Sequence, residues 1–210
     1  MNSSDDLLVK EGKSLPLMEA FYSIQGEGFY SGKASYFLRI GGCDVGCHWC
    51  DVKESWDANL HPLTAVKDIV KLIGKNKVDT VVITGGEPLM WNMSFLTDSL
   101  RQKGLKVHLE TSGSYPLSGK FDWICLSPKK NQRALDEIQQ LANELKIIVQ
   151  NKHDLTWAKQ QQKEVTNSCE LYLQPEWSKK DVVMPIITDF VMKETDWKIS
   201  LQTHKYMNLP

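Results

Sequence analysis

Three of the five cysteines lie close together in the spacing Cys-x3-Cys-x2-Cys: Cys43, Cys47 and Cys50. Thiolates are soft ligands that select zinc, Cu(I) or an iron–sulfur cluster. In a reducing compartment, such a group of cysteines indicates metal binding or redox chemistry before disulfides. Glycines precede and interrupt the run, so we expect a flexible loop and not a helix. This loop is the first candidate site for chemistry.

A fourth ligand is not evident in the sequence. Structural zinc sites and ordinary electron-transfer clusters both normally have four protein ligands. His48 directly follows Cys47 and would be strained as a ligand, whereas Cys125 and Cys169 lie in strand-like runs and are expected in the core. Three thiolates would leave one metal position open to a small molecule, which is typical of a catalytic centre.

Polar and glycine-rich motifs follow several of the predicted strands. Besides the cysteine loop, they are the runs 84–88, 110–113, 127–129, 174–175 and 202–205. One such motif alone is most simply a turn, because turns need Gly, Pro or Ser. Six together predict a ligand site, since the carboxyl ends of parallel strands meet at one edge of a sheet.

The elements that must position these motifs alternate along the chain. Apolar, β-rich runs predict strands at 35–40, 78–84, 105–110, 122–126, 145–149, 169–174 and 197–202. Apolar residues at helical spacing predict helices around 66–73, 92–104, 135–142 and 186–191. This alternation predicts an α/β fold with parallel strands and right-handed crossovers.

The length limits the architecture. A complete eight-unit barrel takes about 250 residues, and the 210 residues here supply six or seven mainly parallel strands. We therefore expect a partial (β/α) barrel in a single domain, 1–210. Connections such as 113–122 look too short for a helix, so we expect fewer helices than strands. Residues 1 to about 15 are polar and are expected to be flexible.

Composition excludes some classes of protein. Lys plus Arg number 25 and Asp plus Glu number 26, a formal net charge of −1, which gives no field to attract nucleic acid or an anionic membrane. The longest apolar stretches fall far short of the ~20 residues of a membrane-spanning helix. The N-terminus is acidic and does not look like a secretion signal. We expect a soluble, cytoplasmic protein.

The cysteine spacing after the first predicted strand, together with Gly85-Gly86-Glu87-Pro88 after the second, resembles the radical S-adenosylmethionine (SAM) superfamily. The resemblance implies a [4Fe-4S] cluster held by three thiolates, with SAM chelating the open iron. In that superfamily one electron cleaves SAM to methionine and a 5′-deoxyadenosyl radical, which removes a hydrogen atom from the substrate. The cofactors carry the chemistry, and the protein orients and shields them.

Further motifs resemble the 7-carboxy-7-deazaguanine synthase family, over residues from about 18 to 210. They are the run 21–28, Phe37-Leu38-Arg39, Cys50-Asp51, the runs 84–88 and 127–129, and the run 202–206. The resemblance implies a lyase that converts 6-carboxy-5,6,7,8-tetrahydropterin to 7-carboxy-7-deazaguanine with loss of ammonia, on the route to queuosine and other 7-deazapurines. It also implies regenerated SAM, assistance by Mg2+, a homodimer, and an electron donor such as flavodoxin or ferredoxin.

The resemblance also assigns site residues by matching position. The residues expected to bind the pterin are Ile24, Gln25, Gly26, Glu27, Arg39 and Thr84. Those expected to bind SAM are Trp49, Cys50, Asp51, Gly86, Glu87, Ser127, Pro128, Lys129 and Gln174, and those expected to hold the cluster are Cys43, Cys47 and Cys50. Arg39 suits a planar carboxylate, and Glu87 suits an ammonium group. No side chain is expected to be catalytic, because the cluster and SAM generate the radical.

The chain departs from the family pattern at one position. The family usually has Thr after the Cys-Asp pair, where its hydroxyl helps to hold Mg2+, but this chain has Val52, which has no side-chain oxygen. Either substrate, water and a group such as Asp51 hold the ion, or the requirement is weaker; we expect weaker or altered Mg2+ dependence. A second hypothesis places the terminal carboxylate of Pro210 near the active rim, although termini are usually free in solvent.

Two other functions stay open at this point. A small radical SAM activating enzyme would place a radical on a protein glycine, which requires a broad docking surface; Arg39 and the run 24–28 favour a small acid substrate instead. A non-enzymatic iron–sulfur or zinc-binding module is the second alternative.

Overall fold

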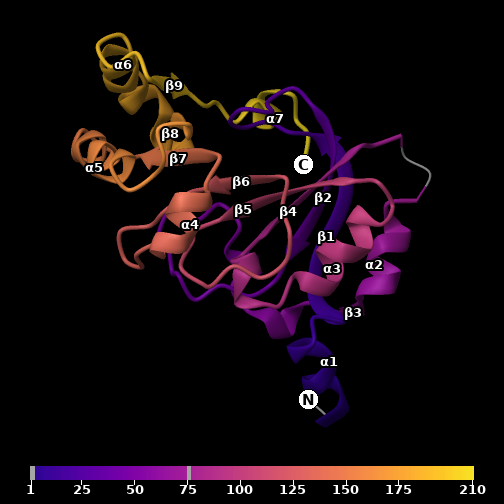
Figure 1. Ribbon diagram of the computed structural model, residues 1–210. Helices are drawn as coiled ribbons and strands as arrows, with labels where there is room; N and C mark the ends of the chain where they lie inside the picture. The colour runs from indigo at the N-terminus through magenta and orange to yellow at the C-terminus, as the bar shows by residue number, and fades with distance from the viewer. Residues whose placement is uncertain (1–2, 75–76) are drawn as a thin grey trace.

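The computed structural model describes residues 3–74 and 77–210, which form an α/β fold around one curved sheet (Figure 1). In this part of the chain the sheet has nine strands in the order β3-β1-β2-β4-β5-β6-β7-β8-β9. The strands are β1 (Ser14–Ile24), β2 (Ala34–Ile40), β3 (Leu63–Ala65), β4 (Thr80–Gly85), β5 (Lys106–Thr111), β6 (Trp123–Leu126), β7 (Glu144–Val149), β8 (Glu170–Pro175) and β9 (Trp197–Ile199).

Seven strands, β2 and β4 to β9, pair in parallel, as the sequence predicts. The prediction missed β1 and β3, which pair with each other in antiparallel fashion; β1 also pairs antiparallel with β2. Strand β1 carries Pro16 and Glu19, and its register with β2 shifts between Leu17 and Glu19. It therefore lacks the alternation that marks a strand in a sequence.

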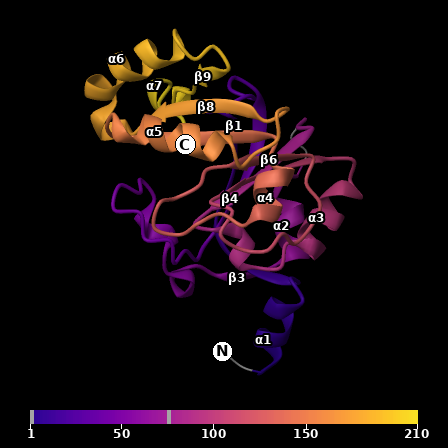
Figure 2. The ribbon, with the colours of Figure 1, turned by 60° about the vertical axis from the view of Figure 1, so that its left-hand side comes forward.

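The described residues contain seven α-helices, fewer than the strands, as predicted. They are α1 (Ser3–Lys10), α2 (Val66–Leu72), α3 (Ser94–Arg101), α4 (Asp136–Leu141), α5 (His153–Gln162), α6 (Lys180–Val191) and α7 (Thr203–Tyr206). Short 3-10 turns lie at Lys53–Ser55, Ala58–Leu60, Pro88–Met90 and Trp177–Lys179. Figures 1 and 2 show α1 projecting away from the body of the molecule.

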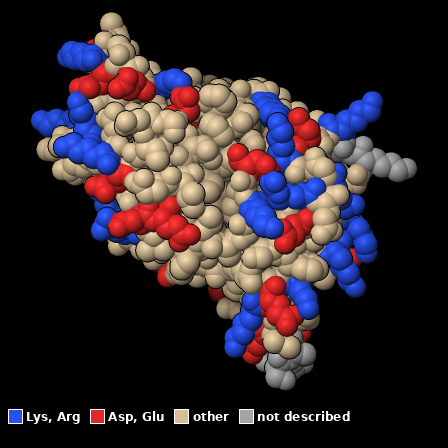
Figure 3. Space-filling view, viewed as in Figure 1, with Lys and Arg blue, Asp and Glu red and all other residues tan. Residues whose placement is uncertain are grey.

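The expected flexible stretch of residues 1 to about 15 contains α1 and the first residues of β1. Met1 and Asn2 lie outside the described residues. No helix in the described ranges combines the length and apolar character that crossing a bilayer requires. On the face shown in Figure 3, positive and negative side chains are interspersed, in keeping with the balanced composition.

Apolar residues of the parallel strands and the inner helix faces form one core. Its fully buried members include Ile83 of β4, Leu109 of β5, Leu126 of β6, Ile147 of β7 and Leu173 of β8. Burial of such side chains stabilises a fold by about 1.5–3 kcal/mol each. This core fixes the strands whose ends carry the motifs.

The two remaining cysteines belong to that core. Cys125 of β6 and Cys169, directly before β8, are buried and free, as predicted. The helical stripes are confirmed at Ile69, Leu96 and Ile138, which are fully buried.

We predict that Ile83→Ala lowers the free energy of unfolding by about 2–5 kcal/mol, because it removes buried methyl groups and leaves a cavity in the core beside β4. Ile83 is 0% exposed. Denaturant unfolding monitored by circular dichroism measures the change. The control is Leu60→Ala, since Leu60 is 71% exposed; equal losses in the two variants would contradict this description of the core.

Candidate active site

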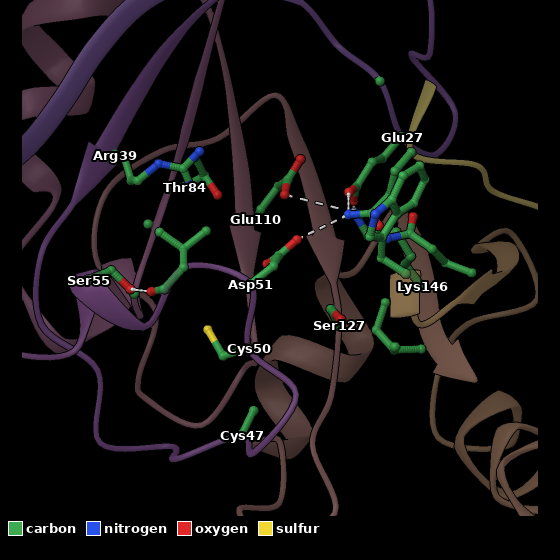
Figure 4. Close-up of a pocket in the computed structure, with 18 of the residues that line it drawn as sticks. Glu27, Arg39, Cys47, Cys50, Asp51, Ser55, Thr84, Glu110, Ser127 and Lys146 are labelled. Carbon is green, nitrogen blue, oxygen red and sulfur yellow. Dashed lines mark hydrogen bonds and ion pairs between the residues drawn. The ribbon is translucent and has the colours of Figure 1, made fainter. Parts of the chain in front are cut away.

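One cavity of about 500 Å³ gathers the predicted motifs. It is bordered by the loops that follow β1, β2, β4, β6 and β8, by strand residues of β5 and β7, and by the C-terminal segment (Figure 4). The predicted site residues that line it are Ile24, Gln25, Gly26, Glu27, Arg39, Cys43, Cys47, Trp49, Cys50, Asp51, Val52, Thr84, Gly86, Glu87, Ser127, Lys129 and Gln174. Pro128, the remaining one, is buried and is not part of the lining.

The three cysteines of the loop line one wall of this cavity as free, half-buried thiols. Burial raises the pKa of Cys43, and the charges of Cys47 and Cys50 raise it further, so the three thiols influence one another. Within residues 3–74 and 77–210, no three His, Cys, Asp or Glu side chains are close enough to hold a single metal ion. The thiols fit a [4Fe-4S] cube, because each thiolate there binds a different iron.

Backbone contacts fix where the cysteine loop begins. The amide of Gly42 donates to the carbonyl of Ser55 at 2.7 Å, and the amide of Cys43 donates to that of Trp56 at 3.0 Å. The indole of Trp91 donates to the carbonyl of Gly41 at 2.9 Å. Residues 55–56 on one side and Trp91 on the other therefore fix the start of the cysteine loop.

The glycine pair after β4 packs against this same point. The amide of Gly86 donates to the carbonyl of Ile40 at 2.9 Å, and the amide of Glu87 donates to that of Gly42 at 2.8 Å. A Cβ on Gly86 would lie 2.3 Å from the Gly42 carbonyl oxygen and 2.9 Å from the Cβ of Cys43. These contacts show a second reason for glycine besides the predicted approach to a ligand: only glycine lets this loop touch the cysteine loop.

The carboxylate of Glu87 is occupied by its own chain. Its Oε1 accepts from the Leu89 amide at 3.0 Å and the Thr111 hydroxyl at 2.6 Å. Its Oε2 accepts from the amide of Ser112 at 2.7 Å and from its hydroxyl at 2.5 Å. A carboxylate has about four acceptor positions, and groups of the chain itself occupy all four here. Glu87 therefore fastens the β4 loop to the end of β5, and its contact with an ammonium group stays a prediction.

The run after β6 contributes a second wall. Lys129 donates to the hydroxyl of Ser127 at 2.7 Å and also to its carbonyl, and its ammonium nitrogen lies 5.5 Å from the ring centre of Trp49. Burial lowers the pKa of Lys129. The cysteine loop and the run 127–129, far apart in sequence, therefore meet here.

The loop between β1 and β2 forms another end of the cavity. Gln25 donates to Oε1 of Glu110 at 2.9 Å, and its own side-chain oxygen accepts from the amide of Glu27 at 3.1 Å. A Cβ on Gly26 would lie 2.1 Å from Nδ1 of His204, so glycine is required where α7 docks on the loop. The carbonyl of Gly26 accepts from the amide of Thr203 at 2.9 Å.

Glu110 and Lys146 complete this end. Glu110 belongs to the predicted rim run 110–113 but was not among the predicted binding residues, and Lys146 was not predicted. The side chain of Lys146 on β7 is 4% exposed; it pairs with Glu27 and lies 3.8 Å from Oε2 of Glu110. Burial acts to raise the pKa of Glu27, but Lys146 and Gln202 outweigh it and hold that pKa at about 2. A lysine inside an otherwise apolar, buried strand is the signal that the sequence offered.

Arg39 and Thr84 lie on the other side of the cavity from Glu27 and Lys146 in Figure 4. Arg39 pairs in register with Thr84 across the parallel strands β2 and β4. Its Nε donates to Glu19 at 2.9 Å across β1 and β2. The cavity thus has Arg39, paired with Glu19, on one side and two carboxylates that share Lys146 on the other.

The expected magnesium position offers few oxygens. Val52 lines the cavity with an apolar side chain. Oδ2 of Asp51 accepts from Lys205 at 2.7 Å and from Gln202 at 3.4 Å. These side chains do not form the set of oxygen ligands that Mg2+ prefers.

The C-terminal segment also borders the cavity. The predicted rim motif 202–205 contributes Gln202, His204 and Lys205, and Pro210 lies in the lining as well. The hydroxyl of Ser23 donates to the carbonyl oxygen of Pro210 at 3.3 Å.

Comparison with known proteins agrees with this geometry. The model of the family described as the Radical SAM superfamily matches residues 38–140. The 7-carboxy-7-deazaguanine synthase of Flavobacterium psychrophilum is 55% identical over 204 residues, covering 97% of both chains. That of Synechocystis sp. is 44% identical, covering 93% of this chain and 94% of its own. The chain belongs to the 7-carboxy-7-deazaguanine synthase family.

This family of radical SAM enzymes also has a solved relative. The crystal structure of QueE from Escherichia coli superposes with a TM-score of 0.81 at 28% identity, covering 95% of this chain and 99% of that one. Radical SAM enzymes require a [4Fe-4S] cluster and SAM, and the three free thiols on one cavity wall fit the cluster. The predicted partial barrel is confirmed as a radical SAM fold.

We predict that Gly86→Ala lowers the iron bound per chain after anaerobic reconstitution by several-fold, because the new methyl group would displace the backbone of the cysteine loop. The control is Gly32→Ala. Gly32 has a φ of 90° but no atom within 4 Å of an added Cβ, so this variant carries backbone strain without displacing the loop. Full iron content in Gly86→Ala would contradict the packing argument.

Proposed function

We propose that the protein is a 7-carboxy-7-deazaguanine synthase, a carbon–nitrogen lyase that converts 6-carboxy-5,6,7,8-tetrahydropterin to 7-carboxy-7-deazaguanine with loss of ammonia. The observation that carries the proposal is one cavity in which a wall of three thiols adjoins Arg39 on one side and two carboxylates on the other. A pterin acid presents both a carboxylate and several N–H donors. The product would feed the formation of queuosine or another 7-deazapurine.

The cysteine loop holds the cofactors in this proposal. Cys43, Cys47 and Cys50 bind the [4Fe-4S] cluster. When bound, the cluster and SAM supply abstraction of a hydrogen atom from the substrate. The residues that we propose for SAM are Trp49, Cys50, Asp51, Gly86, Glu87, Ser127, Pro128, Lys129 and Gln174.

The remaining lining residues orient the substrate. The guanidinium group of Arg39 binds the pterin carboxylate in a bidentate manner. Glu27 accepts N–H groups from the opposite edge of the ring, a task for which an ionised carboxylate is suited. Ile24, Gln25, Gly26 and Thr84 complete the contacts. This arrangement places one defined edge of the ring toward the cofactor wall.

We also propose the wider setting of the reaction. The protein acts in the cytoplasm as a homodimer of single-domain chains, each a radical SAM domain. Its electron donor is a small electron-transfer protein such as flavodoxin or ferredoxin.

Anaerobic reconstitution followed by incubation with SAM, a reductant and the tetrahydropterin acid tests the function. We expect the wild type to form the deazapurine, detected by mass spectrometry. Cys50→Ala should form none, because it removes a thiolate from the cluster, whereas Cys169→Ala should keep the activity, because Cys169 is buried away from the cavity. Cleavage of SAM by the wild type without any deazapurine would refute the proposed substrate.

A second prediction concerns Mg2+. We expect the activity of the wild type to change only slightly between a chelator and excess Mg2+, because Val52 supplies no oxygen and Asp51 is paired with Lys205. Val52→Thr, which is nearly isosteric, should respond more strongly to the ion. A steep requirement in the wild type would count against this reading of the site.

A further inference from the structure

Lys146 occupies an unusual position at the carboxylate side of the cavity. It extends from β7, its ammonium group pairs with Oε2 of Glu27, and Oε2 of Glu110 lies 3.8 Å away. Glu27 comes from the loop after β1, and Glu110 comes from β5. The side chain of Lys146 is 4% exposed and that of Glu27 15%. One buried cation therefore joins two acids from distant parts of the chain.

The other hydrogen bonds to Glu27 and Glu110 indicate that both side chains are ionised. Gln202 donates to Oε1 of Glu27 at 2.9 Å, and Gln25 donates to Oε1 of Glu110 at 2.9 Å. Both amide nitrogens are donors only, as is the ammonium group of Lys146. Every one of these partners suits a carboxylate that accepts hydrogen bonds, and none suits a carboxyl group that carries a proton.

The charged and titratable groups around the pair come from each neighbouring element. Lys146 is faced by Glu27 of the loop after β1, Glu110 of β5, Cys125 of β6 and Glu144 of its own strand β7. Burial opposes the charge of Lys146, but these groups raise the pKa of Lys146 well above its ordinary value. For Glu27 burial favours the neutral form, and Lys146, Gln202 and also His204 of α7 lower its pKa to about 2.

We propose that Lys146 is a positioning residue of this site: it keeps Glu27 ionised and fixed beside Glu110, so that this side of the cavity accepts hydrogen bonds from a ring edge rich in N–H groups. The proposal rests on the proposed function for the identity of the ligand. Burial and a neighbouring carboxylate both favour the protonated form of an acid. Without Lys146, Glu27 would take up a proton and present a donor where the ligand also presents one.

Lys146→Met tests the proposal, because Met is similar in length and has no charge. The probe is pterin-6-carboxylate, an oxidised analogue of the substrate, titrated by calorimetry into the reconstituted enzyme with SAM. We expect a wild-type affinity that is nearly constant from about pH 8 to about pH 6, where a carboxylate with a low pKa stays ionised. In Lys146→Met the affinity should fall by about tenfold or more over this range, because lowering the pH protonates Glu27 once its pKa has risen.

Two further variants separate this role from a structural one. Lys146→Met combined with Glu27→Gln should bind weakly but without the pH dependence, because the titrating group is gone. Lys198→Met removes the ammonium group of an exposed ion pair with Glu170 and should behave as wild type. A flat profile in Lys146→Met, or a pH dependence that persists in the double variant, would overturn the proposal.

A measurement on the wild type covers the case in which Lys146→Met does not fold. In protein labelled with 13C at the glutamate carboxyl carbon, the resonance of Glu27 is assigned by its loss in Glu27→Gln. We expect no titration of that resonance between about pH 8 and about pH 5, and titration near neutral pH would overturn the proposal. Failure of the wild type to bind the pterin at any pH would instead refute the proposed function.

Discussion

The backbone junction between the cysteine loop and the β4 loop is the constraint on which the site depends. Two hydrogen bonds, from Gly86 to Ile40 and from Glu87 to Gly42, join the ends of adjacent parallel strands just before Cys43. Strands β2 and β4 are held in register by the core, so the junction fixes where the three-thiol wall begins. Glu87 then extends the same constraint to β5 through Thr111 and Ser112. Loops positioned by a rigid sheet in this way commonly carry function.

The buried charges of the cavity contribute to stability in a different way from the apolar core of the fold. Removing an ammonium group and carboxylates from water is costly, and replacing such a buried ion pair by apolar residues often leaves a protein no less stable. Lys146 and Glu27 are therefore poor candidates for stabilising the fold. Their arrangement opposite Arg39 is better explained by recognition of a polar ligand that carries charge at one side and N–H donors at the other.

The sequence predicts most of the fold but only part of the site. The seven parallel strands were predicted because their apolar runs are continuous, and six of them are followed by a polar or glycine-rich motif. Strand β1 was missed because Pro16 and Glu19 interrupt its pattern, and tertiary pairing with β2 overrides that local signal. The intrachain hydrogen bonds of Glu87 were not predicted, because a sequence shows a residue type without its partners; two of these partners, Thr111 and Ser112, lie more than twenty positions away. Lys146 was missed because a single lysine in an apolar strand is usually interpreted as exposed.

The central claim is that three thiolates on one wall of this cavity leave one iron of the cluster open to SAM. Electron–nuclear double resonance of the reduced, reconstituted enzyme with SAM labelled with 15N in the amino group tests it most directly. We expect a 15N coupling to the cluster, which a 14N coupling replaces when unlabelled SAM is used. A cluster signal that SAM leaves unchanged, or one with strong coupling to a histidine nitrogen such as that of His48, would contradict it.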